Sequence, residues 1–225
     1  MGKRKQIITI VVIISICCAI MAVVDGIIQP DYAVKSAIKI LVFLIAPVIY
    51  SLCDKELNLR RIFHWNKKGV NLTIGLAVGV YLIILGAYYV GKDIFDFSGI
   101  TKSLTANIGV TGESFVWVAL YISFVNSFLE EFFFRGFAFL TIKKLTSRKF
   151  AYIFSSFMFA LYHVAMMIGW FSIEVYFITM VGLFVGGLLF NYLNEKNETI
   201  YNSWMVHMFA NFAINTIGFI LFGIL

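Results

Sequence analysis

The sequence is poor in charge, because only 13% of its 225 residues are Asp, Glu, Lys or Arg. Soluble domains average about 25% charged and about 45–50% apolar residues, whereas 61% of this chain is hydrophobic. Since so little polar surface cannot cover a folded chain in water, most of its outside must face lipid. The composition therefore excludes a disordered chain and an ordinary soluble enzyme.

Proline, cysteine and several catalytic motifs are also scarce or missing. Two prolines beside seventeen glycines exclude collagen-like and linker-rich material. The three cysteines, Cys17, Cys18 and Cys53, form no CxxC pair, so the sequence predicts neither a disulfide framework nor a cysteine zinc site. The sequence contains no HExxH, GxSxG, Walker A or GxGxxG motif, which argues against zincin, serine-hydrolase and nucleotide-binding chemistry.

Long apolar runs fill most of the chain. None alternates with a period of two, and backbone groups in lipid must be satisfied within their own segment, so the runs predict helices rather than barrel strands. We expect an all-α membrane bundle of seven spans, at about residues 6–24, 36–53, 70–90, 114–142, 150–170, 173–193 and 201–225. The first run is too long for a signal-peptide core and is expected to be a retained anchor. Pro47 is expected to kink the second run.

Positive charge is concentrated at alternate ends of these runs. One side receives the larger set: Lys3, Arg4, Lys5, Lys55, Arg60, Arg61, Lys67, Lys68, Lys143, Lys144, Arg148, Lys149 and Lys196. The other side receives the smaller set: Lys35, Lys39, Lys92 and Lys102. The positive-inside rule therefore predicts a multi-pass cell-membrane protein with a cytoplasmic N-terminus. Because the net charge of +6 belongs to these loops, the expected partner is the lipid bilayer and not a nucleic acid.

Charged residues inside a run are the exceptions, and we identify three: Glu130, Glu131 and Arg135. A charged side chain at the centre of a span costs about 2.5–3.5 kcal/mol on insertion scales. Glu131 and Arg135 are four residues apart and are predicted to pair, whereas Glu130 points about 100° away and stays available. A structural ion pair explains Glu131 and Arg135 well, but it explains Glu130 poorly.

Two histidines also lie inside runs, and His207 shares a helix face with Asn211. At about 1.5 Å per residue from the nearest basic loop residue, Glu130, His163 and His207 lie about 20, 21 and 17 Å deep. Either histidine alone can simply form a hydrogen bond between helices. Polar residues at a common depth on three helices, however, predict one polar chamber. Such a chamber can activate water through a carboxylate and a histidine. Alternatively, Glu130, His163 and His207 can hold a divalent metal ion such as zinc.

Three motifs occur in order on separate runs: EExxxR at residues 130–135, FxxxH at 159–163 and HxxxN at 207–211. Together they resemble the CPBP family, the CAAX proteases and bacteriocin-processing enzymes also called Abi, which includes the Ras-converting type of CAAX endopeptidase. The resemblance covers about residues 115–215. It implies an intramembrane protease, in which a glutamate activates the attacking water.

The resemblance also implies roles for individual residues. Glu130 is the implied general base and His163 the residue that positions the water. The second glutamate and the arginine of the first motif support them, and His207 with Asn211 stabilises the oxyanion. The implied catalytic set is Glu130, Glu131, Arg135, His163, His207 and Asn211. Both a metal-dependent and a metal-free glutamate mechanism are argued for the family, so a metal ion stays possible.

We therefore expect one membrane domain over residues 1–225, with N-terminal spans in 1–113 and a protease core in 114–225. The leading hypothesis is an endopeptidase in a bacterial plasma membrane that cleaves a membrane-associated peptide or protein. The alternative is a non-catalytic protein for bacteriocin self-immunity or for regulation of a membrane sensor. A proton-coupled transporter also uses intramembrane Glu and His, but the chain lacks halves of matching hydropathy. The oligomeric state stays open.

Overall fold

The computed structural model describes residues 2–54, 57–67 and 69–225, so Lys55 and Lys68, both predicted to be cytoplasmic, lie outside the described residues. The described part of the chain is helical and contains no strand. The helical segments long and apolar enough to cross a membrane are Lys3–Ile28, Tyr32–Cys53, Val70–Gly91, Gly112–Leu145, Arg148–Met166, Ile173–Asn197 and Tyr201–Leu221. The prediction of an all-α bundle with seven spans is confirmed.

The N-terminal half contributes three spans and two shorter helices. Its elements are α1 (Lys3–Val23), η1 (Val24–Ile28), α2 (Tyr32–Ile40), η2 (Leu41–Ile45), α3 (Ala46–Cys53), η3 (Leu59–Phe63), α4 (Val70–Gly91) and α5 (Ser98–Ile108). Of these, η1 and η2 are π-helical turns and η3 is a 3-10 helix. Pro47 lies at the start of α3, directly after η2. Its missing N–H removes one α-helical hydrogen bond there, so the π-helical turn lies where the sequence predicts a kink.

The C-terminal half contributes four spans, and the first of these changes helix type along its length. Its elements are α6 (Gly112–Tyr121), η4 (Ile122–Asn126), α7 (Ser127–Glu130), η5 (Glu131–Leu140), α8 (Thr141–Leu145), α9 (Arg148–Met166), α10 (Ile173–Asn197) and α11 (Tyr201–Leu221). The elements η4 and η5 are π-helical. Such segments are rare and occur frequently at functional sites.

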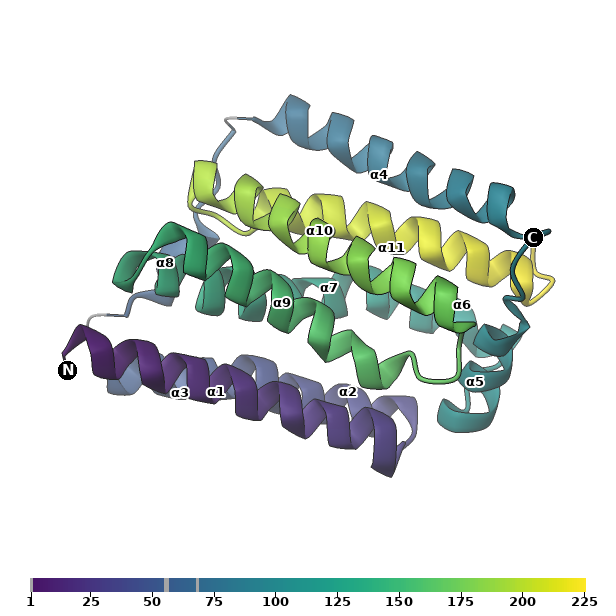
Figure 1. Ribbon diagram of the computed structural model, residues 1–225, viewed down its shortest axis with the longest axis horizontal. Coiled ribbons are helices and arrows are strands. Elements are labelled where there is room, and N and C mark those ends of the chain that lie inside the picture. Colours follow the sequence, from purple (N-terminus) through teal and green to yellow (C-terminus); the bar gives the residue numbers. More distant parts are fainter. Residues whose placement is uncertain (1, 55–56, 68) are drawn as a thin grey trace.

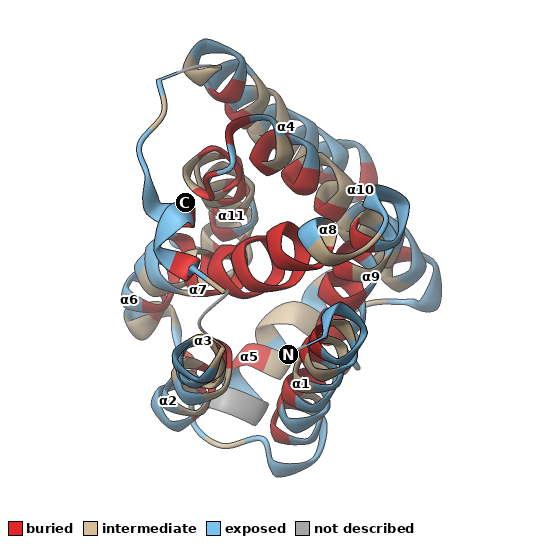
Figure 2. Cartoon of the chain, turned by 90° about the vertical axis from the view of Figure 1, so that its left-hand side faces the viewer, coloured by how far each residue is buried: buried red, intermediate tan, exposed pale blue. Residues whose placement is uncertain are grey.

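The spans are arranged around the helix that carries α7 and η5. Figure 1 shows α1 with α2 and α3 on one side, α4 on the opposite side next to α11, and the two chain ends at opposite ends of the bundle. Figure 2 shows buried residues concentrated in the central helix, whereas the surrounding helices expose their outer faces. Termini at opposite ends agree with an odd number of spans. Which end faces the cytoplasm stays a prediction.

The connection between the third and fourth spans contains the short helix α5. One prediction about the N-terminal half is wrong. The second span begins earlier than residue 36, because the carboxylate of Asp31 accepts hydrogen bonds from the N–H groups of Ala33 and Val34 and caps α2. Lys35 and Lys39 therefore lie inside the bundle as buried residues and not in a loop.

The core is built from aromatic rings around η5, all ten residues of which are buried. The Phe133 ring stacks on Phe43 of the second span with a centroid distance of 4.2 Å, and Phe134 packs edge-on against Phe159 of α9 at 5.4 Å. Offset and edge-on ring pairs contribute beyond their buried area. Rings on η5 thus bind neighbouring spans to the central helix and fix the directions of the polar residues between them.

Close backbone approach fixes α9 against α10. A Cβ atom built on Gly187 of α10 would lie 2.9 Å from the Cβ and 3.0 Å from the Cα of Ser156 on α9, whereas one built on Gly186 meets nothing within 4 Å. Small residues allow membrane helices to pack this closely. The glycine at position 187 thereby sets the position of the helix that carries His163.

We expect Gly187→Ala to lower the free energy of unfolding by about 1–3 kcal/mol, because the added methyl group overpacks the α9–α10 contact. The adjacent Gly186→Ala is the matched control, and it should be neutral or stabilising by up to about 1 kcal/mol through helix propensity. Thermal unfolding of both variants in the same detergent measures the difference. Equal melting temperatures for the two variants would contradict the close contact.

Candidate active site

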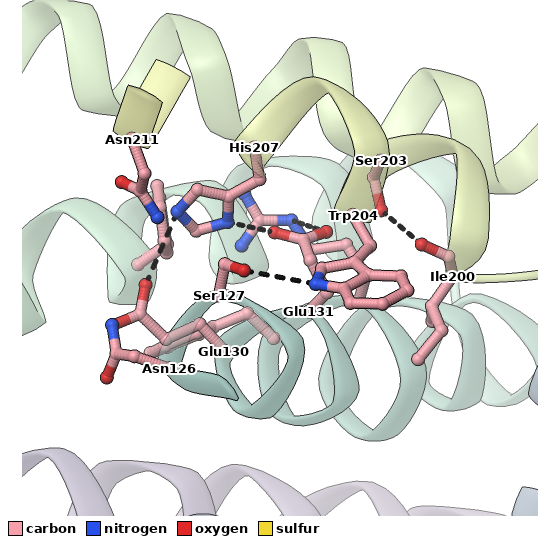
Figure 3. Close-up of polar contacts among 12 residues, drawn as sticks. Asn126, Ser127, Glu130, Glu131, Ile200, Ser203, Trp204, His207 and Asn211 are labelled. Carbon is pink, nitrogen blue, oxygen red and sulfur yellow. Dashed lines mark hydrogen bonds and ion pairs between the residues drawn. The ribbon is translucent and has the colours of Figure 1, made fainter. Parts of the chain in front are cut away.

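The predicted site residues come from separate elements and meet at the centre of the bundle. The end of α7 and the start of η5 supply the EExxxR motif, α9 supplies His163, and α11 supplies His207 and Asn211. All of these side chains are buried. Figure 3 shows the α11 residues above those of α7 and η5, with their polar atoms directed toward one another.

The carboxylate of Glu130 faces both histidines. Its Oε2 atom lies 3.9 Å from Nε2 of His163 and 3.7 Å from Nε2 of His207, and the residue is 2% exposed. These separations exceed a direct hydrogen bond, and polar groups at such distances are commonly bridged by water. The three residues that the sequence analysis placed at one depth therefore surround one small polar region.

The partners of the Nδ1 atoms determine which ring nitrogens point into this region. Nδ1 of His163 lies 2.7 Å from the carbonyl oxygen of Phe159, and Nδ1 of His207 lies 2.9 Å from Oε1 of Glu131. A carbonyl and a carboxylate only accept hydrogen bonds, so each Nδ1 carries the hydrogen and donates it. In the neutral form of each ring, the lone pair is then on Nε2 and faces Glu130.

Glu131 connects His207 to Arg135. Its Oε2 atom lies 3.5 Å from Nε of Arg135, which confirms the predicted pair. Both side chains are fully buried, and the guanidinium lies over the rings of Phe159 and Phe190 at 4.1 and 4.9 Å. The terminal nitrogens of Arg135 have no hydrogen-bond partner within the described part of the chain. Cation–π contact and the Glu131 carboxylate therefore hold this charge.

Asn211 lies one turn beyond His207 and is fixed by the neighbouring span. Its Nδ2 atom donates to the carbonyl oxygen of Ile122 at 3.1 Å. One turn further, Nδ2 of Asn215 donates to the carbonyl of Ala119 and to Oγ of Ser123. The two asparagines thus join α11 to α6 and η4. The amide of Asn211 keeps one N–H beyond the hydrogen that Ile122 accepts, since the side chain has two.

Lys39 is a member of the cluster that the sequence analysis missed. Its Nζ atom donates to Oε1 of Glu130 at 2.9 Å and also to Oδ1 of Asn126, while Nδ2 of Asn126 donates to the same Glu130 oxygen at 2.9 Å. The sequence predicts an unpaired Glu130, but one oxygen of its carboxylate forms an ion pair with Lys39. The signal in the sequence is a lysine inside the second apolar run, at the end that the charge pattern places on the non-cytoplasmic side.

A divalent metal ion at Glu130, His163 and His207 does not fit this donor set. No three His, Cys, Asp or Glu side chains in residues 2–54, 57–67 and 69–225 are arranged to hold one. The ammonium of Lys39 also lies 2.9 Å from Glu130, and a metal ion bound to that carboxylate would be forced close to a buried positive charge. The reaction proposed below therefore uses no metal ion.

Comparison with protein families gives one match, to the family described as type II CAAX prenyl endopeptidase Rce1-like, over residues 112–213. The match covers less than half of the chain and shows what this segment is similar to. It runs from the start of α6 into α11 and contains every site residue predicted from the sequence, which confirms the resemblance to CAAX proteases. The Rce1-like family implies CAAX-type intramembrane protease activity. Comparisons with curated proteins and with solved structures give no match.

We expect Glu131→Ala to destabilise the fold by about 3–5 kcal/mol, because it leaves the buried Arg135 charge uncompensated. The double variant Glu131→Ala with Arg135→Met removes both charges and should recover most of this loss. Unfolding in detergent, with membrane levels measured in parallel, tests the pair. Losses that simply add in the double variant would show that the two side chains do not interact.

Proposed function

We propose that the protein is an intramembrane endopeptidase in which Glu130 activates the attacking water. The observation that carries the proposal is the position of Glu130 Oε2, which faces Nε2 of both His163 and His207 at 3.7–3.9 Å. The family match over residues 112–213 supports protease activity in general. The role of each residue rests on the geometry.

The arrangement suits a water molecule between the carboxylate and a histidine. Such a water donates one hydrogen to Glu130 Oε2 and the other to Nε2 of His163, whose Nδ1 is fixed by Phe159. Glu130 accepts the proton as general base while the water oxygen bonds to the carbonyl carbon of the substrate. The carbonyl π electrons move onto its oxygen. When the C–N bond breaks, the leaving amine takes the proton from Glu130.

We assign stabilisation of the oxyanion to His207 and Asn211. The Glu131 carboxylate accepts from Nδ1 of His207 and stabilises an imidazolium there, as the aspartate of a catalytic triad does. In our proposal His207 takes up this proton from solvent water before the attack, and its Nε2–H is then a donor. The second N–H of the Asn211 amide supplies another donor, because its first is used by Ile122. Preorganised donors of this kind contribute about 10²–10³-fold each to the rate of acyl transfer.

The charges of the site favour this sequence of events. With both histidines neutral, the carboxylates of Glu130 and Glu131 are matched by Lys39 and Arg135, so the four charges cancel. When Glu130 accepts the proton of the water, its negative charge passes to the substrate oxygen, so the net charge of the site does not change. The charge moves away from Lys39, however, within a buried site where water screens it poorly. A His207 that is protonated before the attack supplies a positive charge beside the oxyanion.

The proposed substrate is a peptide bond in a membrane-associated peptide or protein. The site lies at the centre of the bundle, and the surrounding helices carry exposed apolar side chains that face lipid. A substrate that reaches this site must itself partition into the membrane. The same spans also suit the non-catalytic immunity or regulatory role, and the dependence on Glu130 separates the two.

We expect Glu130→Gln and His163→Ala to reduce cleavage by about 10²–10⁴-fold, the usual contribution of a general base, while the protein still inserts. Comparative peptidomics of cells that express each variant or the wild type at matched membrane levels measures the products and identifies the substrate. Glu113→Gln is the matched control, since it makes the same change on an exposed residue of α6. Identical peptidomes for wild type and Glu130→Gln, with the cellular phenotype kept, would favour the immunity or regulatory role.

Chelation tests the metal-free reaction. Because Lys39 already pairs with Glu130, we expect membranes treated with EDTA or phenanthroline to retain their rate of product formation. Loss of activity that added zinc restores, together with zinc bound to the wild type but not to Glu130→Gln, would contradict this prediction.

A further inference from the structure

Lys39 reaches the site from outside the family segment. It lies on α2, whereas the family match begins at residue 112. The side chain is buried, with 5% of the residue exposed. A lysine in this position is costly unless a partner of opposite charge is present, so its partner indicates what it does.

The hydrogen bonds of Lys39 form a closed triangle with Asn126 and Glu130. The ammonium donates to Glu130 Oε1 and to the amide oxygen of Asn126, and the amide nitrogen of Asn126 donates to the same Glu130 oxygen. Oε1 is therefore held by two donors. The other oxygen, Oε2, is left facing the histidines.

Aromatic rings complete the environment of the ammonium. Nζ lies 4.8 Å from the centroid of Tyr162 and 5.9 Å from that of Phe43, and both rings are buried. Tyr162 precedes His163 on α9, and Phe43 stacks on Phe133 of η5. The ammonium of Lys39 thus lies between Phe43 of its own span and Tyr162 of α9.

We propose that Lys39 is a positioning residue that holds the Glu130 carboxylate ionised and directs its Oε2 atom toward the water. The proposal rests on the function proposed above. It makes the N-terminal half a necessary part of the site. Among the described ion pairs, Glu130 is joined to Lys39 of the N-terminal half and to the two histidines of the family segment, so the permanent positive charge comes from Lys39. In this proposal the lysine, and not a metal ion, fixes the carboxylate.

The preceding lysine on α2 provides a matched control. Lys35 lies one turn before Lys39 and is similarly buried, but its ammonium pairs with Asp25 of η1 at 2.5 Å. The groups that face Glu130 are Lys39 and Asn126 at one oxygen and the histidines of α9 and α11 at the other. Lys35→Met therefore removes a similarly buried charge without removing the partner of Glu130.

The experiment compares Lys39→Met, Lys39→Arg and Lys35→Met at matched membrane levels. The first readout is the yield of the products that disappear in Glu130→Gln. A misplaced catalytic group commonly costs about 10²-fold in rate, so we expect a loss of this order in Lys39→Met. Lys39→Arg should retain most of the activity because it keeps the cation, and Lys35→Met should cleave as the wild type does.

The second readout needs no substrate and uses dicyclohexylcarbodiimide, which reacts with carboxylic acids in apolar surroundings and not with ion-paired carboxylates. We expect mass spectrometry to find the label on Glu130 in Lys39→Met and on Asp25 in Lys35→Met. Neither residue should be labelled in the wild type, and Glu130 should stay unlabelled in Lys39→Arg. This readout separates the role of Lys39 from the proposed protease activity, because the labelling pattern is expected even if no cleavage product depends on Glu130.

The double variant Lys39→Met with Glu130→Gln is the control for an effect on folding. If Lys39→Met unfolds because it strands the Glu130 charge, the double variant should regain the melting temperature of Glu130→Gln. Wild-type product yield and an unlabelled Glu130 in folded Lys39→Met would overturn the proposal. A double variant as unstable as Lys39→Met would also overturn it, since Lys39 would then support the fold independently of Glu130.

Discussion

A buried charge in a lipid-facing bundle is stable only beside a charge of opposite sign, and the centre of this protein is arranged around that requirement. Glu130 is paired with Lys39, and Glu131 with Arg135. The first pair joins α2 to α7, and the second lies along η5. Because Lys39 and Glu130 each need the other, the second and fourth spans cannot move apart without exposing an uncompensated ion.

The aromatic core makes this requirement stricter. Phe133, Phe134 and the other rings of η5 exclude water from the central helix, and Arg135 lies over the rings of Phe159 and Phe190. In such surroundings an ion pair is stronger and an unpaired ion costs more than at a surface. The packing that stabilises the bundle therefore also determines how the reactive groups are oriented, and stability and proposed chemistry share the same residues.

The proposed reaction uses asymmetry within one carboxylate. Oε1 of Glu130 is held by Lys39 and Asn126, whereas Oε2 faces His163 and His207 at distances that suit an intervening water. A base needs both features, since it must be ionised and fixed yet keep one oxygen for the proton. The match to CAAX proteases covers the histidines and Asn126, whereas the cation at Oε1 comes from a helix outside the matched segment.

The sequence by itself determined the seven spans, because a bilayer accepts only long apolar helices, and it identified the polar residues of α7, η5, α9 and α11 through their common depth. Tertiary structure decided the rest. Lys39 could not be assigned from the sequence, because a lysine near the end of an apolar run is read as solvated until a carboxylate from another span lies beside it. The π-helical turns of η5 were also missed, since such segments are rare and the apolar run that contains them is read as one continuous helix.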